Sequence, residues 1–137
     1  MAVDPGFGLN NFGAPKIYNE TETVARNVLM VLFGKPGSYP SLPHIGMDIP
    51  KLLLTSYDDL SEDALKQELV NQCSSFSSVV RSGEFDVIKT FNTDKDNVKK
   101  PLLLFKIPTQ IKTKSRNLVI AIESGAKGIT YNFVWVD

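Results

Sequence analysis

A stretch rich in proline and glycine limits the fold of this chain more than any other part of its sequence. Residues 34–50 form a run of 17 residues with three Gly and four Pro. Proline fixes φ and lacks a backbone N–H, so this density excludes a continuous helix or strand and predicts a rigid, extended loop. A connection of this length without regular structure is uncommon in a small domain and is usually functional.

A helix is predicted before this loop, from Glu20 to Phe33. Asn19 is placed to cap it, and Gly34 and Pro36 are placed to end it. Apolar residues recur at helical spacing and predict one buried face. They are Val24, Val28, Val31 and Leu32.

Two further helices are predicted after the loop. The first is short, from Ile49 to Thr55, with Asp48 as its cap and Pro50 in its first turn. The second runs from Ser61 to Phe76, with Ser61 as its N-cap. Its apolar stripe consists of Leu65, Leu69, Cys73 and Phe76.

The pattern changes to strands after Ser82 and Gly83. Pro108 indicates a bend, a bulge or an edge position in the second strand. Helices followed by a run of strands predict an α+β domain, with two or three helices and a small, mainly antiparallel sheet of about four strands. The expected strands are 85–91, 102–107, 118–123 and 130–136.

The first 18 residues are predicted to form an extended arm, and residues 19–137 a single domain. Pro5, Gly6 and Gly8 oppose regular structure in the arm. Phe7 and Phe12 are apolar anchors that a free linker would not need. The arm is therefore expected to pack either on its own domain or on a neighbouring protein.

Composition excludes several classes of function. The chain carries 15 Lys and Arg against 15 Asp and Glu, so it lacks the basic excess typical of nucleic-acid binding. A single Cys cannot form an internal disulfide. No apolar run approaches the length of a membrane span, and the first residues do not resemble a secretory signal. No membrane or nucleic-acid partner is expected.

Few residues suggest chemistry. His44 is the only imidazole and lies between Pro43 and Ile45, where a structural role is favoured over a catalytic or metal-binding one. Cys73 is expected to be a small buried apolar residue. The acidic cluster after the loop fits the positive end of a helix. It consists of Asp58, Asp59, Glu62 and Asp63. We predict no catalytic residue, no cofactor and no metal site.

The Pro/Gly-rich stretch and its surroundings form a recognisable pattern. The matching residues are Gly37, Ser38, Pro40, Pro43, Gly46 and Asp48, with Ile45 and Ile49 as conservative replacements. The pattern, over residues 20–123, resembles the gene-product-25-like family of baseplate wedge proteins from contractile phage tails. That family is related to the E component of type VI secretion baseplates.

Two departures from the family pattern concern its contacts. Tyr39 stands where the family usually has Arg before the first Pro. The family's Glu-Pro-Arg signature should fall within residues 76–80, but Ser77, Ser78 and Val79 stand there. In the family this signature helps to dock onto the helical core of the wedge. The contact is thus expected to be absent or to use a divergent partner with neutral contacts.

The resemblance implies a non-enzymatic structural protein of the virion, located in the tail baseplate and assembled in the host cytoplasm. Its partners would be other baseplate wedge proteins and the tail sheath subunit, with tail tube or hub proteins as further candidates, in a hetero-oligomeric assembly of many copies. It would link the wedge to the first sheath ring and start sheath polymerisation. Two alternatives are a lysozyme-like peptidoglycan hydrolase and an unrelated α+β interaction module.

Two surfaces are the expected assembly interfaces. The loop contributes Gly37, Ser38, Tyr39, Pro40, Pro43, His44, Gly46 and Asp48. The last strand places Tyr131, Phe133 and Trp135 on one face by its alternation. An edge strand can accept a strand from another chain, whereas the alternative is that these aromatic side chains simply close the core.

Overall fold

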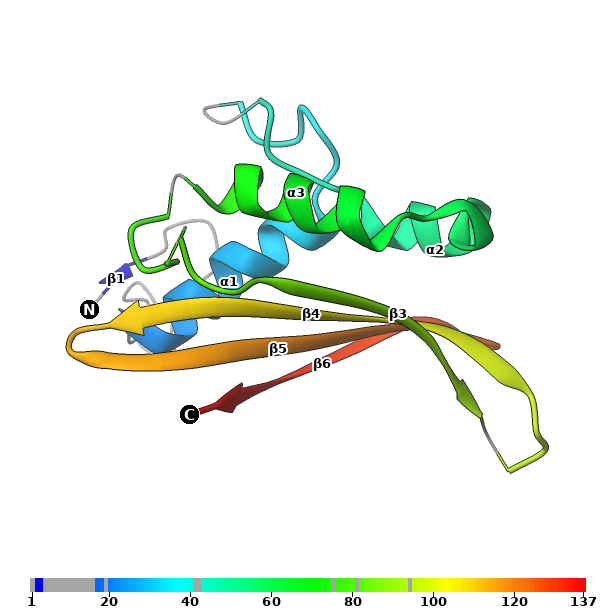
Figure 1. The fold of residues 1–137 in the computed structure, drawn as a ribbon. Coiled ribbons are helices and arrows are strands. Elements are labelled where there is room, and N and C mark those ends of the chain that lie inside the picture. Colours follow the sequence, from blue (N-terminus) through cyan, green and yellow to red (C-terminus); the bar gives the residue numbers. More distant parts are fainter. Residues whose placement is uncertain are drawn as a thin grey trace, which may run out of the picture.

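The computed structural model describes residues 2–3, 17–18, 20–40, 43–74, 76–80, 82–93 and 95–137. Three α-helices and a four-stranded antiparallel sheet confirm the predicted α+β class. The helices lie together on one face of the sheet (Figure 1). The predicted arm falls mainly on residues outside the described ranges, as does Asn19. Of the arm, the structure describes two short antiparallel strands, β1 (Ala2–Val3) and β2 (Ile17–Tyr18).

The helical layer follows the predicted periodicity. Helix α1 spans Glu20–Phe33, α2 spans Ile49–Thr55 and α3 spans Glu62–Cys73, with a 3₁₀ turn η1 at Tyr57–Asp59 between the last two. The Ser61 hydroxyl accepts the Ala64 N–H at 3.2 Å, as expected of an N-cap. The predicted apolar faces of α1 and α3 are buried, apart from Phe76, which is partly buried.

Two helix predictions are corrected. Helix α3 ends at Cys73 rather than Phe76, because the Ser74 hydroxyl donates to the Asn71 carbonyl at 2.6 Å and competes with continuation of the helix. Asp48 occupies the cap position of α2, but its side chain makes no capping hydrogen bond. Its backbone is left-handed there, with φ of 48°.

The sheet is a meander of strands in sequence order, β3-β4-β5-β6. Strands β4 and β5 are both much longer than predicted, and β4 continues through Pro101 and Pro108. Pairing with β5 stops at Leu102 and pairing with β3 stops at Lys106, so each proline lies just beyond one neighbouring strand. The strands are β3 (Asp86–Thr93), β4 (Lys99–Ile111), β5 (Lys114–Gly125) and β6 (Gly128–Val136).

The core lies between the helices and one face of the sheet. Phe105 and Ile120 are paired across β4 and β5 and are fully buried, together with Leu32 of α1 and Leu69 of α3. Burial of each such side chain contributes roughly 1.5–3 kcal/mol to stability. No described helix covers the other face, where Ile88 of β3 is substantially exposed.

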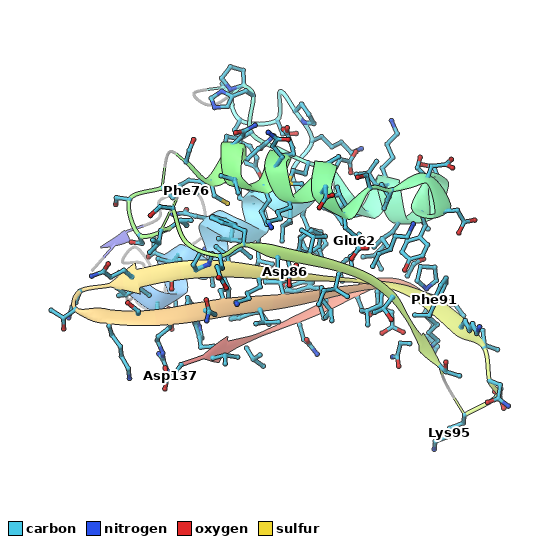
Figure 2. The ribbon with its side chains drawn as sticks, in the orientation of Figure 1. Glu62, Phe76, Asp86, Phe91, Lys95 and Asp137 are labelled. Atoms are coloured by element: carbon cyan, nitrogen blue, oxygen red, sulfur yellow. The ribbon has the colours of Figure 1, made fainter. Side chains whose placement is uncertain are left out.

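The β3–β4 hairpin extends beyond the helical layer and bends away from the rest of the sheet (Figure 1). Phe91 lies at the bend and Lys95 near the tip (Figure 2). The Phe91 ring meets the Tyr57 ring edge-on, with centroids 5.3 Å apart. Tyr57 therefore connects η1 to the base of the hairpin.

Candidate functional site

The three aromatic side chains of β6 face the helices. Tyr131, Phe133 and Trp135 pair directly with core residues of β5, and directly paired residues share a face of the sheet. However, Tyr131 is 52% exposed and Phe133 is 39% exposed, whereas Trp135 is half-buried against the core. The aromatic side chains thus only partly close the core.

An apolar groove runs between α1 and β6. One hollow of about 280 Å³ is lined by Leu29, Met30 and Phe33 of α1 together with Tyr131, and also by the polar Arg26 and Asn27 of α1. A second, of about 360 Å³, continues along the same strand and shares Arg26, Leu29 and Tyr131. Its other lining residues include Ala25, Phe133 and Trp135. We call these two hollows the α1–β6 groove.

The Pro/Gly-rich loop contributes one side chain to this groove. Tyr39 lines the first hollow beside Phe33 and Tyr131, whose ring centroids are 5.1 Å apart. Tyr39 and Tyr131 belong to the two surfaces that the sequence predicted separately. The structure brings them together at one end of the groove.

Trp135 is held at the other end of the groove. The Arg116 guanidinium lies 6.0 Å from the centre of its ring and donates from Nε to Asp137 at 2.7 Å. This hydrogen bond and the charge of Arg116 lower the pKa of the Asp137 carboxyl below its ordinary value. Figure 2 shows Asp137 just beyond the end of β6.

The hydrogen-bonding phase of the sheet can be followed from one edge to the other. The Lys89 N–H of β3 points away from β4 and donates to the Glu62 carboxylate at 3.1 Å. In an antiparallel pair, successive residues direct their backbone groups alternately toward and away from the partner. We followed this alternation across the pairs β3–β4, β4–β5 and β5–β6. It directs the backbone N–H and C=O groups of four β6 residues away from β5. They are Ile129, Tyr131, Phe133 and Trp135.

The two edges of the sheet therefore differ. At the β3 edge, the Lys89 ammonium donates to the carbonyls of Tyr57, Asp58 and Leu60 at 3.1–3.2 Å, and Glu62 lies between α3 and β3 (Figure 2). At the β6 edge, no strand in the described part of the chain pairs with the outward groups. Among the described elements, the β6 edge is therefore the one open to strand addition.

Backbone hydrogen bonds hold the inner part of the loop. The Gly46 N–H donates to Oε1 of the buried Gln72 at 2.7 Å, and Nε2 of Gln72 donates to the Gly46 carbonyl at 3.3 Å. The Met47 N–H donates to the Val31 carbonyl at 2.7 Å, and Ile45 is fully buried. The loop is thus fixed to both α1 and α3.

The predicted loop residues divide into two groups. Gly46 is buried, and Tyr39 and Asp48 are half-buried. The others are exposed on the loop, which rises above α3 on the side turned away from the sheet (Figure 1). These are Gly37, Ser38, Pro40, Pro43 and His44. They do not reach the α1–β6 groove.

The residues considered for chemistry lie apart from the groove. Cys73 is buried, and burial raises the pKa of its thiol to about 12. The acidic cluster is exposed along η1 and the start of α3, where Glu62 binds β3. Within the described ranges, no group of His, Cys, Asp and Glu residues could hold a metal ion, and no helix is long and apolar enough to cross a membrane.

Sequence reasoning missed the α1 wall of the groove. Leu29, Met30 and Phe33 lie outside the predicted apolar face of α1, yet all three are apolar and only partly buried. The sequence alone shows that these three residues give the helix a second apolar face. What lies opposite it depends on the tertiary fold, which spacing along a helix does not show.

No family model, curated protein or solved structure matches this chain. Function is therefore inferred from the α1–β6 groove, the open β6 edge and the resemblance carried by residues 37–49.

Proposed function

We propose that this protein is a structural, non-enzymatic component of a contractile phage tail baseplate. It links the wedge to the first sheath ring and provides the strand on which sheath assembly begins. One observation carries the proposal: β6 turns a row of backbone donors and acceptors outward, directly beside an apolar groove. Together they fit an added strand, whose backbone pairs with the edge while its side chains enter the groove.

The arrangement of the loop supports a linking role. The exposed loop residues lie on the far side of the helices from the sheet (Figure 1). Two partners could therefore bind at once, with wedge proteins at the loop and a sheath subunit at β6. The attachment of the loop through Gly46 and Gln72 would keep the two surfaces in a fixed relation.

A substitution at Tyr131 tests the role of β6. The Tyr131 N–H points outward, so Tyr131→Pro removes a donor from the edge without removing a hydrogen bond to β5. Tyr131→Val is the matched control, because it removes the same ring and keeps the N–H. Sheath polymerisation on reconstituted baseplates, followed by electron microscopy, should be lost with Tyr131→Pro and retained with Tyr131→Val.

Baseplates without the chain provide the second comparison. The proposal is wrong if sheath polymerises on them as well as on complete baseplates. Circular dichroism and thermal unfolding of both variants confirm that each is folded before it is used. If Tyr131→Pro does not fold, Phe133→Pro and Phe133→Val form an equivalent pair, because Phe133 has the same outward phase.

A further inference from the structure

The α1–β6 groove limits which segments can add to the edge. A partner residue that exchanges hydrogen bonds with an outward residue of β6 lies directly opposite it, and its side chain points to the same face of the sheet. For Tyr131, Phe133 and Trp135 that face is the one that carries the helices. Every second side chain of an added strand would therefore point toward α1.

The two hollows match this spacing. Same-face side chains on a strand recur about every 6.4–6.8 Å. Tyr131 lines both hollows, and Phe133 and Trp135, two and four residues further along β6, line the second. Successive inward side chains of one added strand can therefore occupy both hollows.

The lining of each hollow specifies the type of side chain. The first is walled by the rings of Phe33, Tyr39 and Tyr131 with the Met30 thioether, which favours an aromatic side chain or Leu. In the second, Ala25, Leu29, Phe133 and Trp135 provide apolar surface for a large side chain, beside the polar Thr21, Glu22 and Arg26. The intervening side chains would lie beside Asn132 and the exposed Val134 of β6, on the face that no described helix covers, where polar residues remain in contact with water.

We infer that the occupant is an extended segment of a partner chain in which large apolar residues alternate with polar ones over about five residues. It runs antiparallel to β6, as every pair of neighbouring strands in this sheet does. The inference deepens the proposed function and rests on β6 as the strand-accepting edge. The backbone row of β6 is what selects an extended segment, since a helix has no free backbone groups at this spacing.

Two synthetic peptides of identical composition test the pattern. The first has the sequence Lys-Thr-Leu-Thr-Phe-Thr-Leu-Thr-Lys with blocked ends. The second, Lys-Thr-Thr-Leu-Phe-Leu-Thr-Thr-Lys, groups the apolar residues together. The full chain contains a single Trp, so the emission of Trp135 in the second hollow reports binding. The alternating peptide should bind at least about tenfold more tightly, because the second peptide loses at least one apolar contact in the groove.

Variants at Ile129 and Tyr131 complete the experiment. Ile129 has the same outward phase as Tyr131 but lines neither hollow, so Ile129→Pro should weaken binding of the alternating peptide and the matched Ile129→Val should preserve it. Tyr131→Pro should abolish binding, and Tyr131→Val, which keeps the N–H but loses a ring of the groove, should weaken it less. Equal affinity for the two peptides would overturn the alternating pattern, and so would the absence of any change in Trp135 emission with either. Tighter binding of a third peptide, copied from residues 4–12 of this chain, would overturn the assignment to a partner chain.

Failure of the alternating pattern is distinguishable from failure of the proposed function. Sheath polymerisation that depends on the chain and on the Tyr131 N–H, combined with equal peptide affinities, refutes the alternating pattern alone. Polymerisation that is independent of the chain refutes the proposed function, whatever the peptides do.

Discussion

Two positions of the Pro/Gly-rich loop require glycine, for different reasons. Gly37 has φ of +88° and Gly46 has φ of +132°, both in a region that side chains rarely adopt. A Cβ on Gly37 would meet no atom within 4 Å, whereas a Cβ on Gly46 would lie 2.5 Å from the Gly34 carbonyl oxygen. Only Gly46 allows two backbone segments to approach closely.

This difference predicts unequal costs for the same substitution. Gly37→Ala should lower the free energy of unfolding by about 1 kcal/mol, from backbone strain alone. Gly46→Ala should lower it by at least about 2 kcal/mol more, because its contact is with rigid backbone and the hydrogen bonds to Gln72 must also shift. Urea unfolding of the two variants measures both values, and equal losses would show that the close approach has no energetic importance.

Elements with strong periodicity were the most predictable part of the chain. Helix α1 begins and ends at the predicted residues, because its apolar spacing and Gly34 act together. The predicted ends of α3 and β4 were wrong for local reasons. A serine hydroxyl competes for a carbonyl at the end of α3, and each proline of β4 lies where pairing with one of the two neighbouring strands has already ceased. Of the groove, the aromatic face of β6 was predicted, but its meeting with Tyr39 depends on contacts between distant residues.

The two sheet edges show what a single side chain can do for an element. The Lys89 ammonium binds three carbonyls in and beside η1, and so attaches η1 to β3. Such hydrogen bonds involve a charged donor and are stronger than neutral ones. The β3 edge is covered in this way, and no comparable contact between described elements covers β6.

Removal of this ammonium should loosen η1. We expect Lys89→Met to lower the free energy of unfolding by about 1–2 kcal/mol and to speed hydrogen exchange in residues 57–60. Lys51→Met is the matched control, since Lys51 is exposed on α2, and it should change stability by less than about 0.5 kcal/mol. Unchanged exchange in residues 57–60 would contradict the attachment.

At the scale of the molecule, all three helices and one face of the sheet share a single core, and Cys73 lies within it. Burial raises the pKa of the Cys73 thiol from an ordinary 9.0 to about 12. The unfolded chain releases this proton above about pH 9, whereas the folded protein keeps it. The folded state therefore loses stability as pH rises through this window.

The loss of stability at alkaline pH should be visible by comparison with the variant Cys73→Ala. From about pH 8.5 to 10.5, the free energy of unfolding of the natural chain should fall by about 2 kcal/mol more than that of the variant. Denaturant unfolding at the two pH values gives both differences, and contributions from Tyr and Lys cancel between the proteins. Parallel pH profiles would show that the thiol titrates normally.

The order β3-β4-β5-β6 has a kinetic consequence. Each strand pairs with the next one along the chain, and the last two connections are two-residue turns, so the sheet closes only short loops as it forms. Chains rich in local contacts fold quickly, because little loop entropy is lost before pairing begins. The edge on which another protein would build therefore belongs to a sheet whose pairing costs little loop entropy.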